Sequence, residues 1–253
     1  MPTFSEAQLL AWITPLWWPF LRALALLSVM PVLGTRNVPT RVRVALALLL
    51  ALAASPSLPP PPPVPLDSPE ALLLVVQQLL VGLTLGFAVR LVFAAVEFAG
   101  ELVGLQMGLN FAAFFDPLSA STATVPSRLF GTLVAWLFVV IDGHLMVVMA
   151  LVRSFERFPV STEAGSLLRV MQPQAWGAEV FSTGLLIALP LVAMLLLVNG
   201  VLGVISRVAP QINVFAIGFP LTLSVGLIGM LLTLPALQQP FSAALGRMLA
   251  QFQ

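Results

Sequence analysis

The sequence predicts an all-α protein of the integral membrane type, built from helical hairpins in which some helices are broken. Three observations predict this class. Hydrophobic residues make up 59% of the 253 residues and charged residues only 8%, whereas a soluble domain carries about a quarter charged residues. Five apolar runs are long enough to cross a hydrocarbon core of about 30 Å as a helix. Prolines and polar residues interrupt the apolar pattern at several places.

The apolar runs are, in chain order, 8–33, 44–58, 71–96, 129–151, 180–205 and 212–237. All except 44–58 reach the roughly 20 residues that a spanning helix needs. "LPPPPPVP" ends that short run, and we expect a rigid extended connector there because proline cannot donate a backbone hydrogen bond. Nothing in the composition indicates two soluble domains, so residues 1–253 are expected to form a single domain.

The composition argues against several classes of function. The chain has no cysteine and one histidine, which excludes thiolate metal sites and cysteine nucleophiles. A net charge of +1 argues against a nucleic-acid partner, which needs a basic patch. Asp142 and His144 in "VVIDGHLMVV" have no nucleophile motif beside them and indicate a turn or a break in a helix. We therefore expect no enzyme, no catalytic residue, no cofactor and no metal.

A stripe of charged and small residues along the third apolar run is the first candidate site. Residues at i, i+7 and i+11 of a helix share a narrow stripe, glycines let a neighbouring backbone approach closely, and charges at membrane depth usually face a partner or a water-filled cavity. The stripe predicts either an ion pair within this helix or with another helix of the same chain, or a docking face for other subunits, with a proton relay as a third reading. Its members are Gly86, Arg90, Glu97, Glu101, Gly104 and Gly108.

The segment "GLQMGLNFAAFFDPLSASTATVPSR" (104–128) is the second candidate site. It is too irregular to face lipid, because unsatisfied backbone groups there cost several kcal/mol each. One reading is an extramembrane loop whose aromatic residues rest at the interface. The other is a constriction element in which soft apolar side chains close a passage. The residues concerned are Met107, Asn110, Phe111, Phe114, Phe115, Asp116 and Pro117.

The segment "RVAPQINVFAIGFP" (207–220) is the third candidate site. Arg207, Pro210 and Gln211 are predicted to end one long helix, and Gly218 and Pro220 are predicted to interrupt the next one. Two such breaks indicate a helical hairpin whose tip is held by neighbouring protein. A plain surface turn would account for the first break only.

The segment "RVAPQINVFAIGFPLTL" closely resembles the signature of the FliR/SctT family of type III secretion. "VPTRVRVALALLLALAASPSLP", "VQQLLVGLTLGFAVRLVFAAVEFAGELVGLQMGLNFA" and "DGHL" match the family in order and approximate spacing, and "GLQMG" with "APQ…IGFPLT" favours its flagellar branch. The resemblance implies a FliP-like part over 1–176 and a FliQ-like hairpin with a C-terminal tail over 177–253.

The resemblance also implies a function. Members of this family assemble with FliP and FliQ into an export gate for unfolded flagellar proteins, with FlhB around its cytoplasmic opening and FlhA nearby. The assembly belongs to the flagellar basal body at the bacterial inner membrane and is raised toward the periplasm. The loop that corresponds to Gly108–Pro126 is expected to plug the channel.

A small-solute secondary transporter is the alternative function. Broken helices suit transporters, which use them to build binding sites. A transporter would also predict internal repeats and ionisable residues in both halves of the chain. No convincing repeat is visible, and charges are few between 180 and 237, so a structural and gating subunit of an export gate is the preferred prediction.

Overall fold

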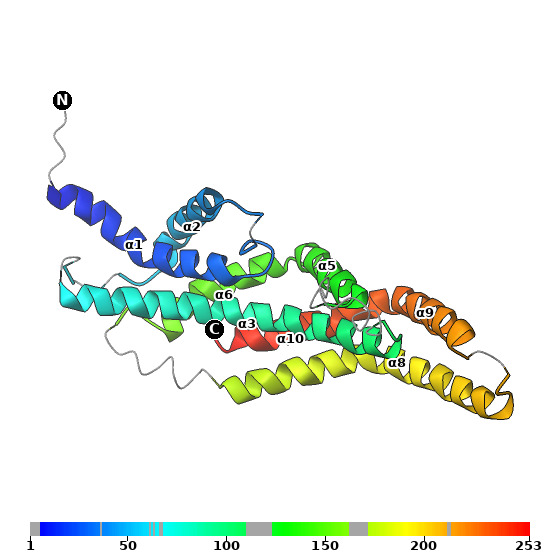
Figure 1. Ribbon diagram of the computed structural model, residues 1–253. Helices are drawn as coiled ribbons and strands as arrows, with labels where there is room; N and C mark the ends of the chain where they lie inside the picture. Colours follow the sequence, from blue (N-terminus) through cyan, green and yellow to red (C-terminus); the bar gives the residue numbers. More distant parts are fainter. Residues whose placement is uncertain are drawn as a thin grey trace. The chain divides into compact units, whose positions relative to one another are not determined.

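The computed structural model describes residues 6–35, 37–60, 62, 64–65, 68–109, 123–161, 172–211 and 214–253 (Figure 1). All regular structure in this part of the chain is helical, which confirms the predicted all-α class. The α-helices are α1 (Glu6–Val29), α2 (Thr40–Ala54), α3 (Pro69–Gln106), α5 (Val125–Val140), α6 (Gly143–Arg157), α8 (Pro173–Val208), α9 (Val214–Thr233) and α10 (Gln238–Ala250), with 3₁₀ turns η1 (Ser55–Ser57) and η2 (Leu234–Leu237).

Within the described residues, four helical stretches are long and apolar enough to cross a membrane, or five if α5 and α6 count as one broken span. The stretch Thr40–Ser57 is one of them, although the run 44–58 was expected to be too short, because the helix begins four residues earlier and continues into η1. Helix α3 has 38 residues and α8 has 36. At 1.5 Å per residue, each helix is longer than about 50 Å and therefore longer than a hydrocarbon core is thick.

The predicted break near Asp142 is confirmed. Helix α5 ends at Val140 and α6 begins at Gly143. Asp142 has a φ of 56°, in the left-handed region, which aspartate tolerates better than most side chains do. The predicted run 129–151 is therefore two helices rather than one.

The predicted interruption at Gly218 and Pro220 is wrong. Helix α9 runs from Val214 to Thr233 with Pro220 inside it. A proline removes the hydrogen bond to the carbonyl four residues before it and crowds that carbonyl, and membrane helices tolerate this when neighbouring groups and local adjustments satisfy the freed carbonyl. Pro190 lies within α8 in the same way.

The chain divides into two compact units. Unit 1 comprises Met1–Leu91, Asp142–Trp176 and Leu245–Gln253, and unit 2 comprises Val92–Ile141 and Gly177–Ala244. The division into a FliP-like part (1–176) and a FliQ-like part (177–253) rests on resemblance to other proteins, and it stays a prediction.

Unit 1 is centred on Arg22 of α1, whose side chain is fully buried. Its guanidinium donates to the side chains of Gln78 on α3 and Ser154 on α6 and to the backbone carbonyl of Phe158. The guanidinium carbon lies 3.6 Å from the ring centroid of Phe155, a cation–π contact. Four of the five N–H groups of this arginine, which lies in the apolar run 8–33, thus have partners within the chain.

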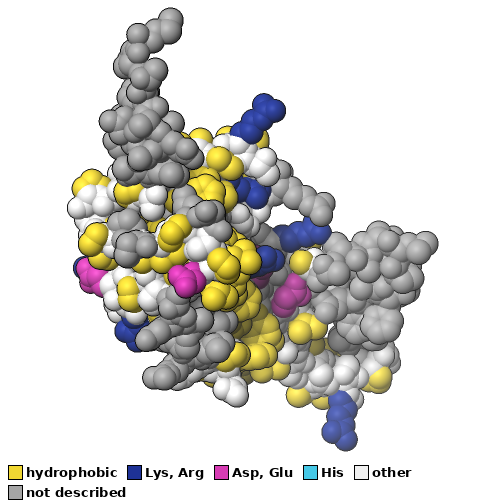
Figure 2. All heavy atoms as spheres, turned by 90° about the vertical axis from the view of Figure 1, so that its left-hand side faces the viewer, with side chains coloured by type: hydrophobic (Ala, Val, Ile, Leu, Met, Phe, Trp, Pro, Cys, Tyr) yellow, Lys and Arg dark blue, Asp and Glu magenta, His cyan; other side chains and the backbone are white. Residues whose placement is uncertain are grey.

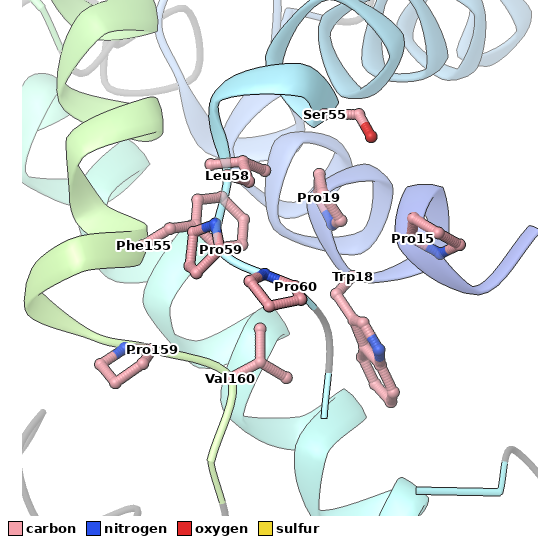
Figure 3. A pocket seen from close by; sticks show the side chains of 10 residues that line it. All are labelled: Pro15, Trp18, Pro19, Ser55, Leu58, Pro59, Pro60, Phe155, Pro159 and Val160. Atoms are coloured by element: carbon pink, nitrogen blue, oxygen red, sulfur yellow. The ribbon is translucent and has the colours of Figure 1, made fainter. Parts of the chain in front are cut away.

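The proline tract packs against the core of unit 1 rather than serving only as a connector. Pro59 and Pro60 line a pocket of about 260 Å³ together with Trp18 of α1 and Phe155 of α6 (Figure 3). Val64 packs against the cluster formed by Trp18, Ala71 and Leu74. Prolines from three segments line this pocket, namely Pro15, Pro19, Pro59, Pro60 and Pro159.

Unit 2 combines an aromatic core with an apolar exterior. Phe93 packs edge-to-face on Phe138 and Phe241, with ring centroids 5.4 and 5.6 Å apart. Helix α9 returns alongside α8 (Figure 1), where Gly229 meets Leu191 and Met194. The outer sides of both helices expose many large apolar side chains. On the one face of the molecule that Figure 2 draws, hydrophobic side chains likewise outnumber charged ones among the described residues. This surface suits lipid or other subunits rather than water.

Candidate functional site

The candidate site is the base of segment 110–122, where the chain leaves α3 and enters α5 within unit 2. The predicted plug residues Asn110, Phe111, Phe114, Phe115, Asp116 and Pro117 lie outside the described residues. The residues that flank the segment are described, and they meet: a Cβ on Gly104 would lie 2.7 Å from the side-chain oxygen of Thr124. The geometry of both ends therefore defines how the segment is anchored.

The first end is closed by a Schellman motif, in which a left-handed residue terminates a helix. Gly108 has a φ of 79°. Its N–H donates to the carbonyl of Leu105, and the N–H of Leu109 donates to the carbonyl of Gly104, both at 3.1 Å. Gly108 was expected on the helical stripe, but it ends α3 instead, because glycine adopts this backbone conformation without a Cβ clash.

Two side chains of the α8–α9 hairpin hold the carbonyls at this end of α3. The amide of Asn199 on α8 donates to the carbonyl of Gln106 at 3.2 Å. The hydroxyl of Thr222 on α9 is shared between the carbonyl of Met107 at 3.4 Å and that of Phe219, within α9, at 3.1 Å. The last carbonyls of a helix have no partner inside it, so these bonds satisfy acceptors that would otherwise be left unpaired.

Met107 itself is a packing residue in this structure. Its side chain is 1% exposed and lies against Gly226 of α9, where a Cβ would come within 2.7 Å of its Cγ and Sδ. Met107 was grouped with the plug, but its burial makes it an anchor for the base of the segment. The hairpin thus holds α3 by two hydrogen bonds and one close apolar contact.

The second end of the segment is capped by Glu101 of α3. Its Oε1 accepts the backbone N–H of Thr124 at 2.9 Å, and the Thr124 hydroxyl accepts the N–H of Ser127 as N-cap of α5. A carboxylate is favourable at this end of a helix, because the N–H groups and the helix dipole are positive there. Gly100 brings α3 and α5 together, since a Cβ there would lie 2.5 Å from the Cα of Ser127.

Other residues of the charged stripe also contact segments of the same chain. Glu97 lies over Gly131 of α5, where a Cβ would be 3.1 Å from its Oε1. Gly86 faces the carbonyl of Leu26 in unit 1, at 2.8 Å from a built Cβ. Arg90 and Glu97 are exposed. Other segments of the same chain therefore pack against the glycines of the stripe. Docking of other subunits stays a prediction for its charged residues.

The predicted hairpin tip lies at the end of α8. Helix α8 ends at Val208, and Arg207, Pro210 and Gln211 are exposed. Gly218 is buried and Pro220 exposed within α9. Among the described residues, no group of three histidine, aspartate or glutamate side chains is placed to hold a metal ion.

Sequence reasoning missed Asn199, Thr222 and Gly226, although a signal was present. Asn199 and Thr222 are polar residues inside apolar runs, and a polar group in an apolar environment is costly unless it is hydrogen-bonded. Their partners, however, are backbone carbonyls more than 90 positions away in the chain. No local pattern could have paired them.

Comparisons with known proteins place the chain among export proteins. The family described as "Bacterial export proteins, family 1" matches residues 13–248. The flagellar biosynthetic protein FliR of Escherichia coli (strain K12) is 44% identical over 237 residues, which cover 94% of this chain and 90% of that protein. The protein of the same name from Pectobacterium carotovorum subsp. carotovorum is 40% identical over 242 residues, covering 96% and 92%. That from Bacillus subtilis (strain 168) is 29% identical over 213 residues, covering 83% and 82%.

Proposed function

Because the chain belongs to family 1 of the bacterial export proteins, we propose that it is a structural and gating subunit of the flagellar type III export gate. In this role it helps to form the channel through which unfolded flagellar proteins leave the cell. FliP, FliQ and FlhB are its partners in the gate, FlhA lies nearby, and the assembly stands in the basal body at the inner membrane, raised toward the periplasm.

The anchoring of the residues that flank segment 110–122 is the observation that supports the gating role. Asn199 and Thr222 hold Gln106 and Met107 on one side, and Glu101 holds Thr124 on the other. Between these ends the sequence offers three phenylalanines and a run of small residues. A fixed base with soft apolar side chains suits a seal, because a narrow apolar ring excludes water and ions by dewetting.

The lengths of α3 and α8 support a position raised out of the bilayer. Each outreaches a hydrocarbon core of about 30 Å. The surplus turns carry exposed apolar side chains, such as Val204 and Val208 near the end of α8. Neighbouring subunits would cover these side chains, which explains why the chain exposes so much apolar surface on its own.

Purification from native membranes tests the proposal. A tagged copy of the chain should restore swimming to a strain that lacks its own copy, and FliP and FliQ should co-purify with it. A homo-oligomer or a monomer in mild detergent would contradict the proposal and favour the small-solute transporter. An assembled complex without secretion of flagellar proteins into the medium would contradict the export role alone.

A further inference from the structure

A second apolar feature lies in unit 1. It is an open groove of about 280 Å³ between α1 and α2. Its walls are Ile13, Leu16, Trp17 and Phe20 of α1 and Val44 and Leu48 of α2. Residues 13, 16, 17 and 20 follow the i, i+3, i+4, i+7 spacing of one helix face, so the groove is a continuous strip. None of its lining side chains is charged.

The groove continues toward a cation. Arg41 lies on the first turn of α2 and precedes Val44 and Leu48 by three and seven residues. Residues at this spacing share one face of a helix, and seven residues span about 10 Å along its axis. Arg41 is exposed.

The neighbouring Arg43 is committed elsewhere. Its Nη2 donates to the backbone carbonyls of Thr35 and Val38, at 2.6 and 3.0 Å, and so it fixes the connection that leads into α2. Arg41 is therefore the cation of this turn that can serve a ligand at the surface.

We propose that the α1–α2 groove binds an anionic phospholipid. One acyl chain lies along the apolar strip, between Trp17 and Leu48, and the phosphate of the headgroup pairs with Arg41. Charge complementarity favours this ligand over other occupants. A cation at one end of an otherwise uncharged groove complements a molecule that has an anionic headgroup and an apolar tail. Arginine suits a phosphate, because its planar fork of N–H donors matches two phosphate oxygens, and Trp17 has the amphipathic ring common at membrane interfaces.

The exposure of the groove residues supports this occupant. Trp17, Val44 and Leu48 are 37%, 43% and 45% exposed. These side chains are half-buried, as expected for the walls of a groove. Contact of their remaining apolar surface with water is unfavourable, so this surface favours an apolar ligand. A lipid supplies that cover while leaving its headgroup in water. The proposal does not depend on the gating role of segment 110–122.

Native mass spectrometry of the purified export complex tests the site with phosphatidylglycerol and phosphatidylcholine as probes. We expect the complex to retain phosphatidylglycerol in preference to phosphatidylcholine. Arg41→Gln should lower the affinity for phosphatidylglycerol about fivefold, the effect of one cation near an anionic lipid. Arg128→Gln is the matched control, because Arg128 is exposed on α5 in unit 2, and it should change nothing. Equal retention of both lipids, or an equal effect of the two substitutions, overturns the proposal.

A second pair of variants tests the apolar strip. Leu48→Asp puts a carboxylate into the apolar strip, where it disfavours the acyl chain and has the same sign of charge as the phosphate, and it should abolish the preference for phosphatidylglycerol. Leu49→Asp should preserve it, since Leu49 is 61% exposed and does not line the groove.

Photochemical capture identifies the occupant directly. A diazirine side chain in place of Leu48 should gain the mass of one phospholipid on irradiation. Capture of a FliP or FliQ subunit, or of a second copy of the chain, shows that protein fills the groove and overturns the proposal.

Discussion

The Nε and Nη2 atoms of Arg22 both donate to Oε1 of Gln78, at 2.9 and 2.6 Å. The hydrogen-bond network extends beyond this pair. The amide of Gln78 donates to Oε1 of Gln77, and the amide of Gln77 donates to the carbonyl of Pro159. Arg22 and Gln78 are fully buried. The pair therefore joins α1 to α3, and its extensions join both to the segment after α6.

Removing one member of this pair should destabilise unit 1 strongly. Gln78→Leu would leave the buried guanidinium without its carboxamide partner, and breaking a buried charged network in this way costs about 3–5 kcal/mol. The complex should lose its subunits at a lower temperature, measured by thermal shift in detergent. Gln174→Leu, at an exposed position of α8, is the control.

Lysine should not replace arginine at position 22. Its ammonium has three donors on a single nitrogen and cannot reach the side chains of Gln78 and Ser154 and the carbonyl of Phe158 together. Arg22→Lys should therefore lower the yield of folded chain in the membrane nearly as much as Arg22→Met. Full stability of the lysine variant would show that charge alone suffices and that the fork of donors is unimportant.

The contact of α3 with α5 should not tolerate even one methyl group at Gly100. A Cβ there would lie 2.5 Å from the Cα of Ser127, and backbone atoms cannot turn away as a side chain can. Gly100→Ala should weaken the N-terminus of α5 and make the chain more sensitive to protease. Gly203→Ala on α8 is the control, because a Cβ there meets nothing within 4 Å and alanine gains up to about 1 kcal/mol of helix propensity.

The break near Asp142 and the end of α8 near Arg207 could be predicted because each depends on local chemistry. Asp-Gly favours a turn, and a basic residue in the last turn with a proline one to three residues further on is typical of a helix end. Pro220 misled the same reasoning, since its effect depends on what surrounds the freed carbonyl. Gly108 also gave a wrong expectation, because four-residue spacing does not reveal where a helix stops.

The network around Arg22 was beyond local reasoning for another reason. The sequence contains one arginine within the apolar run 8–33, which signals a buried partner. Its partners Gln78 and Ser154 are 56 and 132 positions away. The existence of a polar centre could have been predicted, but the helices that it joins could not.

Arg90 is the best remaining test of the docking stripe. It is exposed on α3, whereas Gly86 and Gly104 pack within the chain, so leucine at those glycines would disturb folding and docking alike. Arg90→Ala should leave the chain stable in the membrane but lower the amount of FliP or FliQ that co-purifies. An unchanged subunit complement would mean that the stripe serves the chain alone.

The base of segment 110–122 should loosen when its hydrogen bonds are removed. Thr222→Val keeps the side-chain volume but deletes the hydroxyl that is shared between the carbonyls of Met107 and Phe219, and the Met107 carbonyl loses its tie to α9, where an unpaired buried acceptor costs up to about 1–3 kcal/mol. We expect a larger ion leak through an otherwise assembled complex. Thr132→Val is the matched control, because its hydroxyl bonds only within α5, to the carbonyl of Arg128.

Deleting residues 110–120 tests the seal itself. Glu101, Thr124 and the α8–α9 hairpin still hold both ends of the segment, so the complex should assemble with its usual subunits. With Phe111, Phe114 and Phe115 removed, the passage would lack the apolar side chains that exclude water. Conductance measured in a planar bilayer without export substrate should rise above that of the intact complex. A fully assembled deletion complex with unchanged conductance would show that these phenylalanines pack against the protein surface and that another element closes the channel.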